Sequence, residues 1–379
     1  MIIDKTKKGV NFGKIIENKS ELKLYKRLMN EILEYIKINN SVSFIDILRD
    51  VGGSDRRILR LLDELVDKKI ISYKNSYFML KEYNKNNFDS KDSLCRKCKG
   101  SIINIKNLSI INKKMREIFK NKPIPTFIFD QRPVTLETTI KRVAYLIHKR
   151  DIKDKKIAIL GDDDLTSIAL AFTKLPKEIY VFEIDKRLTS FIRKISEEFN
   201  LNIKVIEQDL TKEPNKRLLN YFDVFMEDPT PEKIPFTVFT NFGIKILNCK
   251  SAVGYISIYS SAMNKSIEIQ KVINKMNFLM TDIIPKFTEY DFVEHTYTKR
   301  DKELLKKYNL NKKPICFNES LIRVEKTERT KPIKITYKKS DLFGKATKRV
   351  IKDFNKDPAS RITSITEKKY IINEIKKMI

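Results

Sequence analysis

The chain has 379 residues and a formal net charge of +28, from 77 Lys and Arg against 49 Asp and Glu. No stretch reaches the roughly 18 apolar residues of a membrane span, the start lacks a signal-peptide core, and four cysteines are too few for a secreted disulfide framework. We therefore expect a cytoplasmic protein. The positive charge favours a nucleic-acid partner, but Lys, Ile and Asn are frequent throughout, as in a thermophile, so we do not expect one.

Residues 1–85 are predicted to form a winged-helix-like domain. Helical patterns cover residues 22–36, 42–51 and 55–69, and two strands follow around a turn between residues 70 and 80. The third helix carries Arg56, Arg57 and Arg60 on its expected outer face. Such a domain can bind DNA through that helix, or it can serve dimerisation or cover a substrate. Inside an enzyme chain we favour the second interpretation.

Residues 86–134 form a polar connector that contains Cys95-Arg-Lys-Cys98. A CxxC turn suits half of a zinc ribbon. The other half is missing, because Cys249 and Cys316 are isolated in the sequence. A metal at Cys95 and Cys98 is therefore an alternative that we do not favour.

Residues 135–337 are predicted to form an α/β domain, because strand and helix patterns alternate there. This order implies a parallel sheet with right-handed crossovers, the layout of a class I methyltransferase-like Rossmann domain. Residues 338–379 are basic and weakly patterned, so we expect a flexible tail with a short terminal helix. We expect strands at 156–160, 179–184, 203–206, 224–226 and 253–259, helices at 136–149, 165–175, 186–199, 215–221 and 236–247, and the last strands beyond Thr288.

Acidic residues follow four consecutive predicted strands. Ligands of open parallel sheets bind beyond the carboxyl ends of the strands, so these acids should meet at one rim. The first turn has carboxylates where nucleotide-binding turns have glycines, and it should repel a phosphate and attract a cation. The acids are Asp162, Asp163 and Asp164 after Gly161, then Glu183 and Asp185, Glu207 and Asp209, and Glu227 and Asp228.

The second and third strand ends are expected to bind an adenosine group. Glu183 follows the first turn by roughly 20 residues, where an acid commonly holds ribose hydroxyls. Asp209 is placed to accept the adenine amino group, and Gly161 and Asp185 complete the predicted nucleotide site. A solvated loop acid is the alternative at Glu183. For the three aspartates, a metal ion or simple stabilisation by the helix dipole are the competing interpretations.

Asp228-Pro229-Thr230-Pro231 is similar to the Asp/Asn-Pro-Pro-aromatic motif of amino-group methyltransferases, with Thr230 in the third place and no aromatic residue. A carboxylate beside an attacking amine can accept its proton or orient its lone pair. An S-adenosylmethionine-dependent N-methyltransferase acting on nucleic acid is therefore one alternative function. A winged-helix DNA-binding regulator with a degenerate enzyme domain is another.

Three segments together resemble the archaeal and thermophilic branched-chain polyamine synthases: Gly161-Asp-Asp-Asp-Leu165, Val181-Phe-Glu-Ile-Asp185 and Glu227-Asp-Pro-Thr-Pro231. The resemblance covers essentially the whole chain. It implies an N4-bis(aminopropyl)spermidine synthase, which transfers two aminopropyl groups from decarboxylated S-adenosylmethionine to the central secondary amine of spermidine and releases methylthioadenosine. The donor is a co-substrate, so no cofactor or metal is expected. We also expect a homodimer.

The resemblance and the acidic rim lead to the same site. Ordinary S-adenosylmethionine carries a carboxylate that the aspartates would repel, whereas the decarboxylated donor and spermidine carry ammonium groups. Asp163 or Asp164 is expected to contact the nucleophilic amine, with Asp228 or Glu227 opposite. The tail from Asp341 onward is expected to close over substrate. The predicted catalytic residues are Asp163, Asp164 and Asp228; the predicted substrate-binding residues are Asp162, Glu227, Pro229, Gln131 and Tyr259, with Phe129, Phe236 and Tyr259 as apolar walls.

Overall fold

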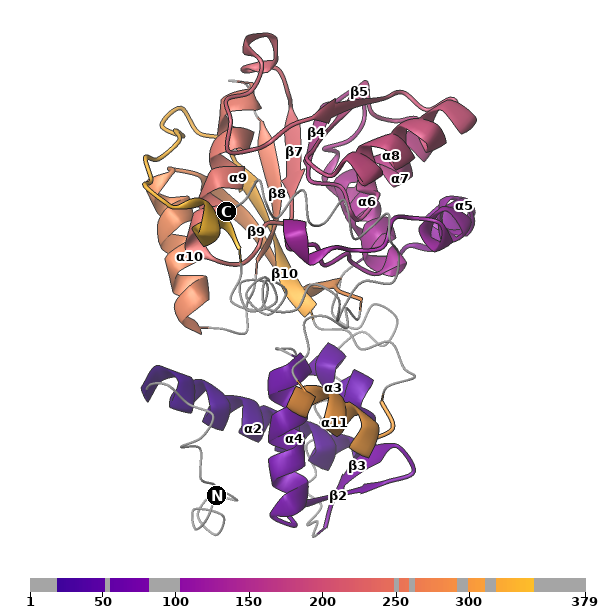
Figure 1. Cartoon of the computed structure of the whole chain (residues 1–379), viewed down its shortest axis with the longest axis vertical. Helices are drawn as coiled ribbons and strands as arrows, with labels where there is room; N and C mark the ends of the chain where they lie inside the picture. The colour runs from indigo at the N-terminus through magenta and orange to yellow at the C-terminus, as the bar shows by residue number, and fades with distance from the viewer. Residues whose placement is uncertain are drawn as a thin grey trace.

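The computed structural model describes residues 19–51, 55–81, 103–248, 252–258, 263–291, 299–310 and 318–343. They form a smaller helical unit and a larger α/β unit, which Figure 1 shows one below the other. Cys95, Cys98, Tyr259 and the tail from residue 344 lie outside the described residues. Within the described ranges, no helix combines the length and apolar character that crossing a membrane requires.

The smaller unit begins with three helices and a three-stranded antiparallel sheet whose middle strand is the last in sequence. The three helices and the hairpin follow the order predicted from the sequence, and buried Leu and Ile side chains fill their common core. Whether this unit acts as a winged helix stays a prediction. The helices are α2 (Lys19–Asn39), α3 (Phe44–Asp50) and α4 (Asp55–Asp67), and the strands are β1 (Ser41–Val42), β2 (Ile71–Lys74) and β3 (Tyr77–Leu80).

A helix from much later in the chain completes this core. Helix α11 (Lys299–Lys307) packs against α4, as Figure 1 shows, and the side chains of Leu304 and Tyr308 are buried in the same core as α4. Arg60 of α4 donates two hydrogen bonds to Asp301 of α11, at 2.7 and 3.0 Å. The smaller unit is thus built from two separate stretches of chain. The residues of α11 belong to it, although they fall within the range 135–337 predicted for the Rossmann-like domain.

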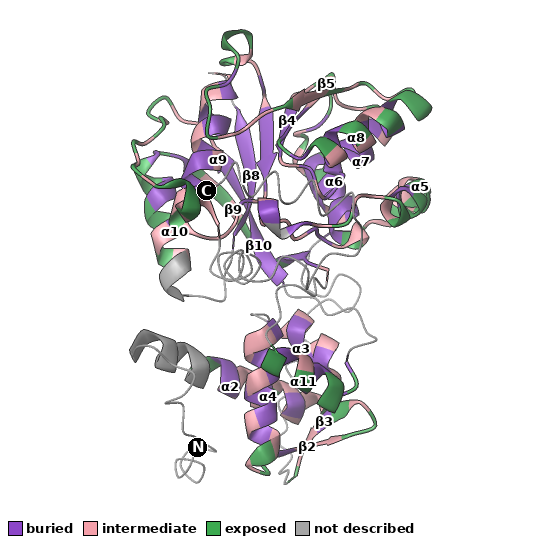
Figure 2. Ribbon diagram, in the orientation of Figure 1, coloured by how far each residue is buried: buried purple, intermediate pink, exposed green. Residues whose placement is uncertain are grey.

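The larger unit is built on a seven-stranded sheet. Most of its central strands are buried along their whole length, as expected for strands covered on both faces. Figure 2 shows this buried layer running through the sheet, with exposed residues on the outer helix faces. The strands are β4 (Lys156–Leu160), β5 (Glu178–Glu183), β6 (Ile203–Glu207), β7 (Val224–Glu227), β8 (Val253–Ile258), β9 (Leu279–Glu289) and β10 (Asn318–Glu325).

The strand order is β6-β5-β4-β7-β8-β10-β9. The first five strands pair in parallel, and β10 pairs antiparallel with both β8 and β9. The order reverses next to β4, so the carboxyl ends of β4 and β7 flank the point where open α/β sheets bind ligands. This is a class I methyltransferase-like layout, as predicted.

Helices cover both faces of the sheet. The group on one face shares a core with the Ile and Val side chains of β4 and β5, and the other face is packed by a Phe-rich core. The first group is α5 (Ser109–Lys120), α6 (Leu136–Lys149), α7 (Thr166–Phe172) and α8 (Lys186–Glu198), and the second is α9 (Lys233–Ile246) and α10 (Met263–Lys275); short 3₁₀ turns are η3 (Lys106–Leu108), η4 (Phe127–Phe129), η5 (Lys216–Leu218) and η7 (Lys339–Leu342).

Most predicted elements are confirmed, and two are corrected. The helix at 136–149 and the strand at 156–160 match α6 and β4 at both ends. The helix expected at 215–221 is only the 3₁₀ turn η5, because its apolar side chains are too few to form a buried stripe. Strand β9 starts at Leu279 rather than beyond Thr288; its first half is an exposed edge, which leaves little hydrophobic signal.

Candidate functional site

Carboxylates meet at the carboxyl edge of the sheet, around the ends of β4, β5 and β7. The residues Asp162, Asp164, Glu183 and Glu227 are each at most 5% exposed. Burying a carboxylate is costly unless hydrogen bonds or opposite charges stabilise it. The partners of each acid therefore indicate which acids support the fold and which are free to bind a ligand.

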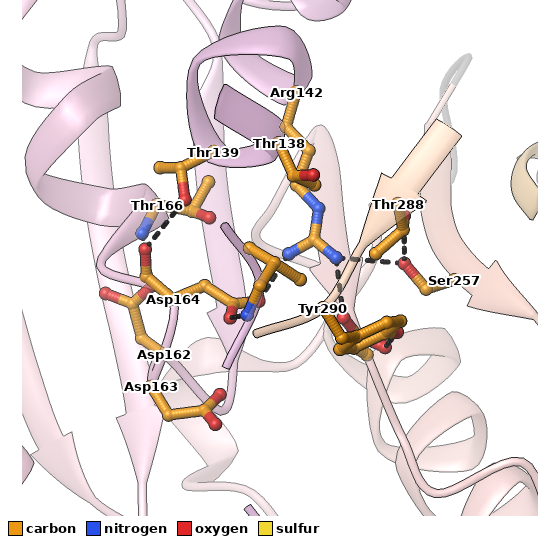
Figure 3. Close-up of polar contacts among 12 residues, drawn as sticks. Thr138, Thr139, Arg142, Asp162, Asp163, Asp164, Thr166, Ser257, Thr288 and Tyr290 are labelled. Atoms are coloured by element: carbon orange, nitrogen blue, oxygen red, sulfur yellow. Dashed lines mark hydrogen bonds and ion pairs between the residues drawn. The ribbon is translucent and has the colours of Figure 1, made fainter. Parts of the chain in front are cut away.

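The three consecutive aspartates point in different directions (Figure 3). Asp162 accepts hydrogen bonds from the backbone N–H of Thr166 at 2.7 Å and from the hydroxyl of Ser167 at 2.5 Å, so it caps the start of α7. Burial raises its pKa to about 8. This geometry favours a helix cap over the substrate contact that the sequence predicted for Asp162.

Asp164 is engaged by a buried arginine. Its carboxylate accepts hydrogen bonds from the backbone N–H of Val134 at 2.7 Å and from Arg142 Nη1 at 2.5 Å. Arg142 lies on the inward face of α6 and is only 2% exposed. Its Nη2 donates to Asp228 at 2.5 Å and to the Ser257 hydroxyl at 2.9 Å. Arg142 thus joins two of the predicted catalytic aspartates, Asp164 and Asp228.

The pKa of Arg142 is raised. Burial alone would lower it, but the charges of Asp164 and Asp228 outweigh the burial. The guanidinium therefore stays charged, and the predicted amine contact by Asp164 competes with this ion pair. Arg142 was not among the residues predicted for the site. The signal was one charged residue on the otherwise uncharged inner face of a predicted amphipathic helix.

Asp228 is also held by Tyr290, which follows β9. The Tyr290 hydroxyl lies 2.6 Å from Asp228 Oδ1 and 3.0 Å from Glu319 Oε2 of β10. Burial raises the pKa of Asp228 to about 6, and Arg142 opposes that rise. Burial likewise raises the pKa of Glu319 to about 8. The sequence identified neither Tyr290 nor Glu319, because both lie in the region where strands were placed only approximately.

Glu227 has one partnered and one unpartnered oxygen. Thr240 Oγ1 of α9 donates to its Oε1 at 2.6 Å, whereas Oε2 is buried and has no hydrogen-bond partner within the described part of the chain. Burial raises the pKa of Glu227 to about 8. A ligand N–H placed there would supply the missing donor.

Asp163 is the aspartate of the turn that stays available. It is half-buried, and its carboxylate forms no hydrogen bond with any described residue. In Figure 3 its side chain points away from Arg142. Burial, and then the neighbouring charge of Asp164, raise its pKa well above the usual value. Lys122 Nζ lies 3.5 Å from the backbone oxygen of Asp163 and counteracts that rise.

The predicted nucleotide residues lie on the β5 side of the site. Glu183 accepts the backbone N–H groups of Asp162 at 2.9 Å and of Asp185 at 2.8 Å, and each oxygen keeps a lone pair for a ribose hydroxyl. Gly161 has a φ of +77°, which suits glycine in this tight turn. Asp209 is half-buried and accepts the backbone N–H of Thr211 at 2.9 Å.

Asp185 and Gln131 form a structural contact. Asp185 is fully buried, caps α8 through the backbone N–H of Arg187 at 2.9 Å and accepts Gln131 Nε2 at 3.0 Å. Gln131 in turn accepts the backbone N–H of Thr126 at 2.8 Å. These bonds fix the loop before α6 against the end of β5. They favour a supporting role for both residues over the ligand contacts that the sequence predicted.

The residues after Asp228 also shape the site. Pro229 is buried, and the Thr230 hydroxyl donates to Asp130 at 2.6 Å, so Thr230 ties the motif to the 3₁₀ turn η4. Phe129 of that turn is half-buried and stays a candidate wall. Phe236 is fully buried in the core under α9, so the prediction that it forms a pocket wall is wrong.

The predicted DNA-binding face of the third helix is covered. Arg60 forms its two hydrogen bonds to Asp301, which is fully buried, and Arg56 and Arg57 are half-buried rather than exposed. Helix α11 packs directly against α4. This packing corrects the expectation that these three arginines lie on an open face.

Within the described residues, no group of three His, Cys, Asp or Glu side chains has a geometry that could hold a metal ion. The three aspartates after β4 are split between a helix cap, an ion pair and an unpaired position. The turn therefore does not direct its three carboxylates toward one common point.

Comparisons with known proteins agree on one family. The model of the branched-chain polyamine synthase A C-terminal domain matches residues 110–348. The N(4)-bis(aminopropyl)spermidine synthase of Methanocaldococcus jannaschii is 35% identical over 286 residues, which cover 73% of this chain and 81% of the relative. The enzyme of the same name from Thermococcus kodakarensis is 32% identical over 297 residues, covering 74% and 83% of the two chains.

A solved structure supports the fold. The branched-chain polyamine synthase of Thermus thermophilus, in complex with N4-aminopropylspermidine and 5′-methylthioadenosine, superposes with a TM-score of 0.66. The match covers 84% of this chain and 97% of that one, at 20% sequence identity. The similarity thus extends over both the helical and the α/β units.

Proposed function

Because the chain belongs to the branched-chain polyamine synthase A family, we propose that it transfers aminopropyl groups from decarboxylated S-adenosylmethionine to the central secondary amine of spermidine. Two transfers give N4-bis(aminopropyl)spermidine and two molecules of methylthioadenosine. The names of the curated relatives and the ligands in the Thermus complex support this reaction.

The observation that carries the proposal is the excess of buried acid at the sheet edge of a basic protein. Arg142 balances part of the charge of Asp164 and Asp228, whereas Asp163 and Glu227 each keep a carboxylate oxygen without a partner among the described residues. Such a site is complementary to ammonium groups. A carboxylated sulfonium nucleotide would bring an anion into the same region, so the decarboxylated donor is favoured.

The reaction itself is a displacement at the carbon next to the sulfonium. The lone pair of a neutral secondary amine forms the new C–N bond, and the C–S bond breaks with its electron pair going to sulfur, so methylthioadenosine leaves as a neutral thioether. After the first transfer the product nitrogen is a positively charged tertiary ammonium, which must lose its proton before its lone pair can attack a second donor. After the second transfer the nitrogen is a quaternary ammonium and has no proton to lose. We assign Asp163 to hold the amine and accept the proton released after the first transfer, with Glu227 and Asp228 on the other side of the nucleophile.

The remaining assignments follow from the same site. Glu183, with Gly161 and Asp209, is proposed to hold the nucleoside. We propose that four further residues hold the site in shape through their contacts within the protein: Asp162, Asp164, Asp185 and Gln131. A homodimer in the cytoplasm is the proposed form of the protein, and light scattering during gel filtration would test the dimer.

Two measurements test the function. Mass spectrometry of a reaction with spermidine and decarboxylated S-adenosylmethionine should detect first one and then two added aminopropyl groups. Calorimetry should show tighter binding of the decarboxylated donor than of S-adenosylmethionine. The opposite order, with no transfer product, would support the N-methyltransferase alternative.

A further inference from the structure

One contact between the smaller unit and the α/β unit lies at the end of α3. Arg49, in the last turn of α3, donates two hydrogen bonds to the carboxylate of Glu289, at 2.6 and 3.2 Å. Asn318 donates to the backbone oxygens of Leu48 at 3.1 Å and of Arg49 at 3.3 Å. The carbonyl groups at the end of a helix lack partners within the helix, so Asn318 completes α3.

Glu289 and Asn318 are themselves paired across the sheet. Glu289 is the last residue of β9, Asn318 is the first residue of β10, and the two face each other in the ladder. Both are buried, at 7% and 4% exposure. Residues at the end of α3 therefore form hydrogen bonds with both members of this cross-strand pair.

The chain neighbours of this pair reach the candidate active site. Tyr290 follows Glu289, Glu319 follows Asn318, and successive residues of extended chain point to opposite sides. The Tyr290 hydroxyl lies 2.6 Å from Asp228 and 3.0 Å from Glu319. Two residues adjacent in the chain, Glu289 and Tyr290, thus make the contact with α3 and the hydrogen bond to Asp228.

From this geometry we infer that the smaller unit has a positioning role in the transfer reaction. Arg49, through Glu289, holds Tyr290 where its hydroxyl donates to Asp228, and Asn318 does the same for Glu319. The inference rests on the proposed function, and it gives the N-terminal unit a role other than DNA binding. Arg49 is a positioning residue, because the hydrogen bonds described for its side chain lead to Glu289, and they act on Asp228 through Tyr290.

The energetics of a buried ion pair support this role. Removing Arg49 would leave the Glu289 carboxylate without that partner in a buried place, and the end of β9 would shift to reach water or another donor. A displacement of about 1 Å at a catalytic group can cost roughly 100-fold in rate. A shift of this size at Tyr290 would be enough to break its hydrogen bond to Asp228.

The same unit offers a matched control. Arg60 forms a two-bond link to Asp301 that resembles the link between Arg49 and Glu289 in geometry, and both connect residues about 240 positions apart. The link of Arg60, however, leads to α11 in the core of the smaller unit. Breaking it should loosen the unit without reaching Tyr290.

The experiment compares Arg49→Gln, Arg60→Gln and Arg49→Lys in the full chain, with Tm, kcat and KM for spermidine as readouts. Both Gln variants should lower Tm. Only Arg49→Gln should lower kcat, by about tenfold or more, and Arg49→Lys should recover part of the loss. Unchanged kcat in Arg49→Gln, or an equal loss in Arg60→Gln, would overturn the inference.

A pH profile separates positioning from general loosening. Asp228 is faced by Arg142 of α6, Asp164 of the β4 turn, Tyr290 after β9 and Glu319 of β10, with Glu227 as its chain neighbour. The hydrogen bond from Tyr290 lowers the pKa of Asp228. Its loss in Arg49→Gln should move the acid limb of kcat to higher pH, and Arg60→Gln should leave that limb in place.

A second measurement does not depend on the reaction. The Tm losses of Arg49→Gln and Tyr290→Phe should not add in the double variant, whereas those of Arg60→Gln and Tyr290→Phe should add. Additive losses for both pairs would refute the coupling. If the wild-type protein made no transfer product, only the proposed function would be refuted. The comparison of Tm losses in the single and double variants would still test the coupling between Arg49 and Tyr290.

Discussion

Arg142 donates a hydrogen bond of 2.5 Å to Asp228, from the inner face of α6 to the end of β7. This contact places a fixed positive charge inside a site that otherwise gathers carboxylates. It divides the acids into a pair that shares one counter-charge, Asp164 and Asp228, and a pair that keeps unpartnered carboxylate oxygens among the described residues, Asp163 and Glu227. The positive charge also limits where a substrate ammonium can lie, because like charges repel.

Replacing Arg142 should damage both stability and turnover. Arg142→Gln leaves two buried carboxylates without their main counter-charge, and removing one partner of a buried ion pair costs about 3–5 kcal/mol. Arg323→Gln is the matched control, because Arg323 is also buried and pairs with Asp151 and Glu325 away from the site. Both variants should lower Tm in thermal unfolding, but only Arg142→Gln should lower kcat beyond the loss of folded protein. Equal kcat in the two would contradict the assignment.

Asp163→Asn should lower kcat by roughly 100-fold to 10,000-fold, the range for losing a group that moves a proton. The fold should survive, because the carboxylate of Asp163 forms no hydrogen bond to a described residue. Circular dichroism and steady-state kinetics check the two halves of this prediction. Glu117→Gln on the exposed side of α5 is the control. Wild-type activity in Asp163→Asn would remove this residue from the mechanism.

Asp162→Ala should lower the stability of the fold more than it lowers turnover. Its carboxylate caps α7 through Thr166 and Ser167, and losing such a cap costs about 0.5–2 kcal/mol. We expect a lower Tm with most of kcat retained in the folded fraction. A large fall in kcat at unchanged Tm would instead restore the substrate contact that the sequence predicted.

The stability of the ligand-free protein should fall as pH rises. Burial raises the pKa of Glu227 and Glu319 from an ordinary value near 4.5 to about 8. Between these values the folded state holds protons that the unfolded state has released, so unfolding becomes easier with increasing pH until both states are ionised. Tm measured from pH 5 to pH 9 should decline, and Glu227→Gln should flatten the decline. Glu213→Gln, at an exposed position, should not.

Glu183→Ala should weaken nucleoside binding. The variant loses the acceptor proposed for the ribose hydroxyls, and hydrogen bonds to a charged group contribute about 1.5–3 kcal/mol, which is at least tenfold in Kd. Calorimetry with methylthioadenosine measures the change. Asp223→Ala is the control, because Asp223 accepts the Lys156 N–H at the opposite edge of the sheet. An unchanged Kd for Glu183→Ala would mean that another residue holds the ribose.

Local patterns predicted much of the fold. Strand β4 and helix α6 were placed at their observed ends, because each is bounded by turn or capping residues such as Thr135 and Gly161. Two features of the fold were not predicted from the sequence. Helix α11 has no sequence signal that would assign it to the smaller unit, since its partner α4 lies about 240 residues earlier. The exposed first half of β9 lacks the alternation that marks a strand.

The sequence predicted the acidic residues of the candidate site, but it did not predict the residues that pair with them, such as Arg142 and Tyr290. The position of Asp163, Glu183, Glu227 and Asp228 at one edge follows from parallel strands, whose carboxyl ends share that edge. The directions of the side chains do not follow from the sequence. Only the structure distinguishes Asp162 as a cap from Asp163 as an available acid.

Helix α11 also has a consequence for how the protein is made. The core of the smaller unit includes Leu304, Tyr308 and Leu310, so a nascent chain cannot complete it until translation has passed residue 310. Until then the part of α4 that packs against α11 stays uncovered, while most strands of the α/β sheet have already been synthesised. The N-terminal end of this polypeptide is therefore among the last parts to finish folding, and such delayed, long-range closure slows folding and exposes the intermediate to aggregation.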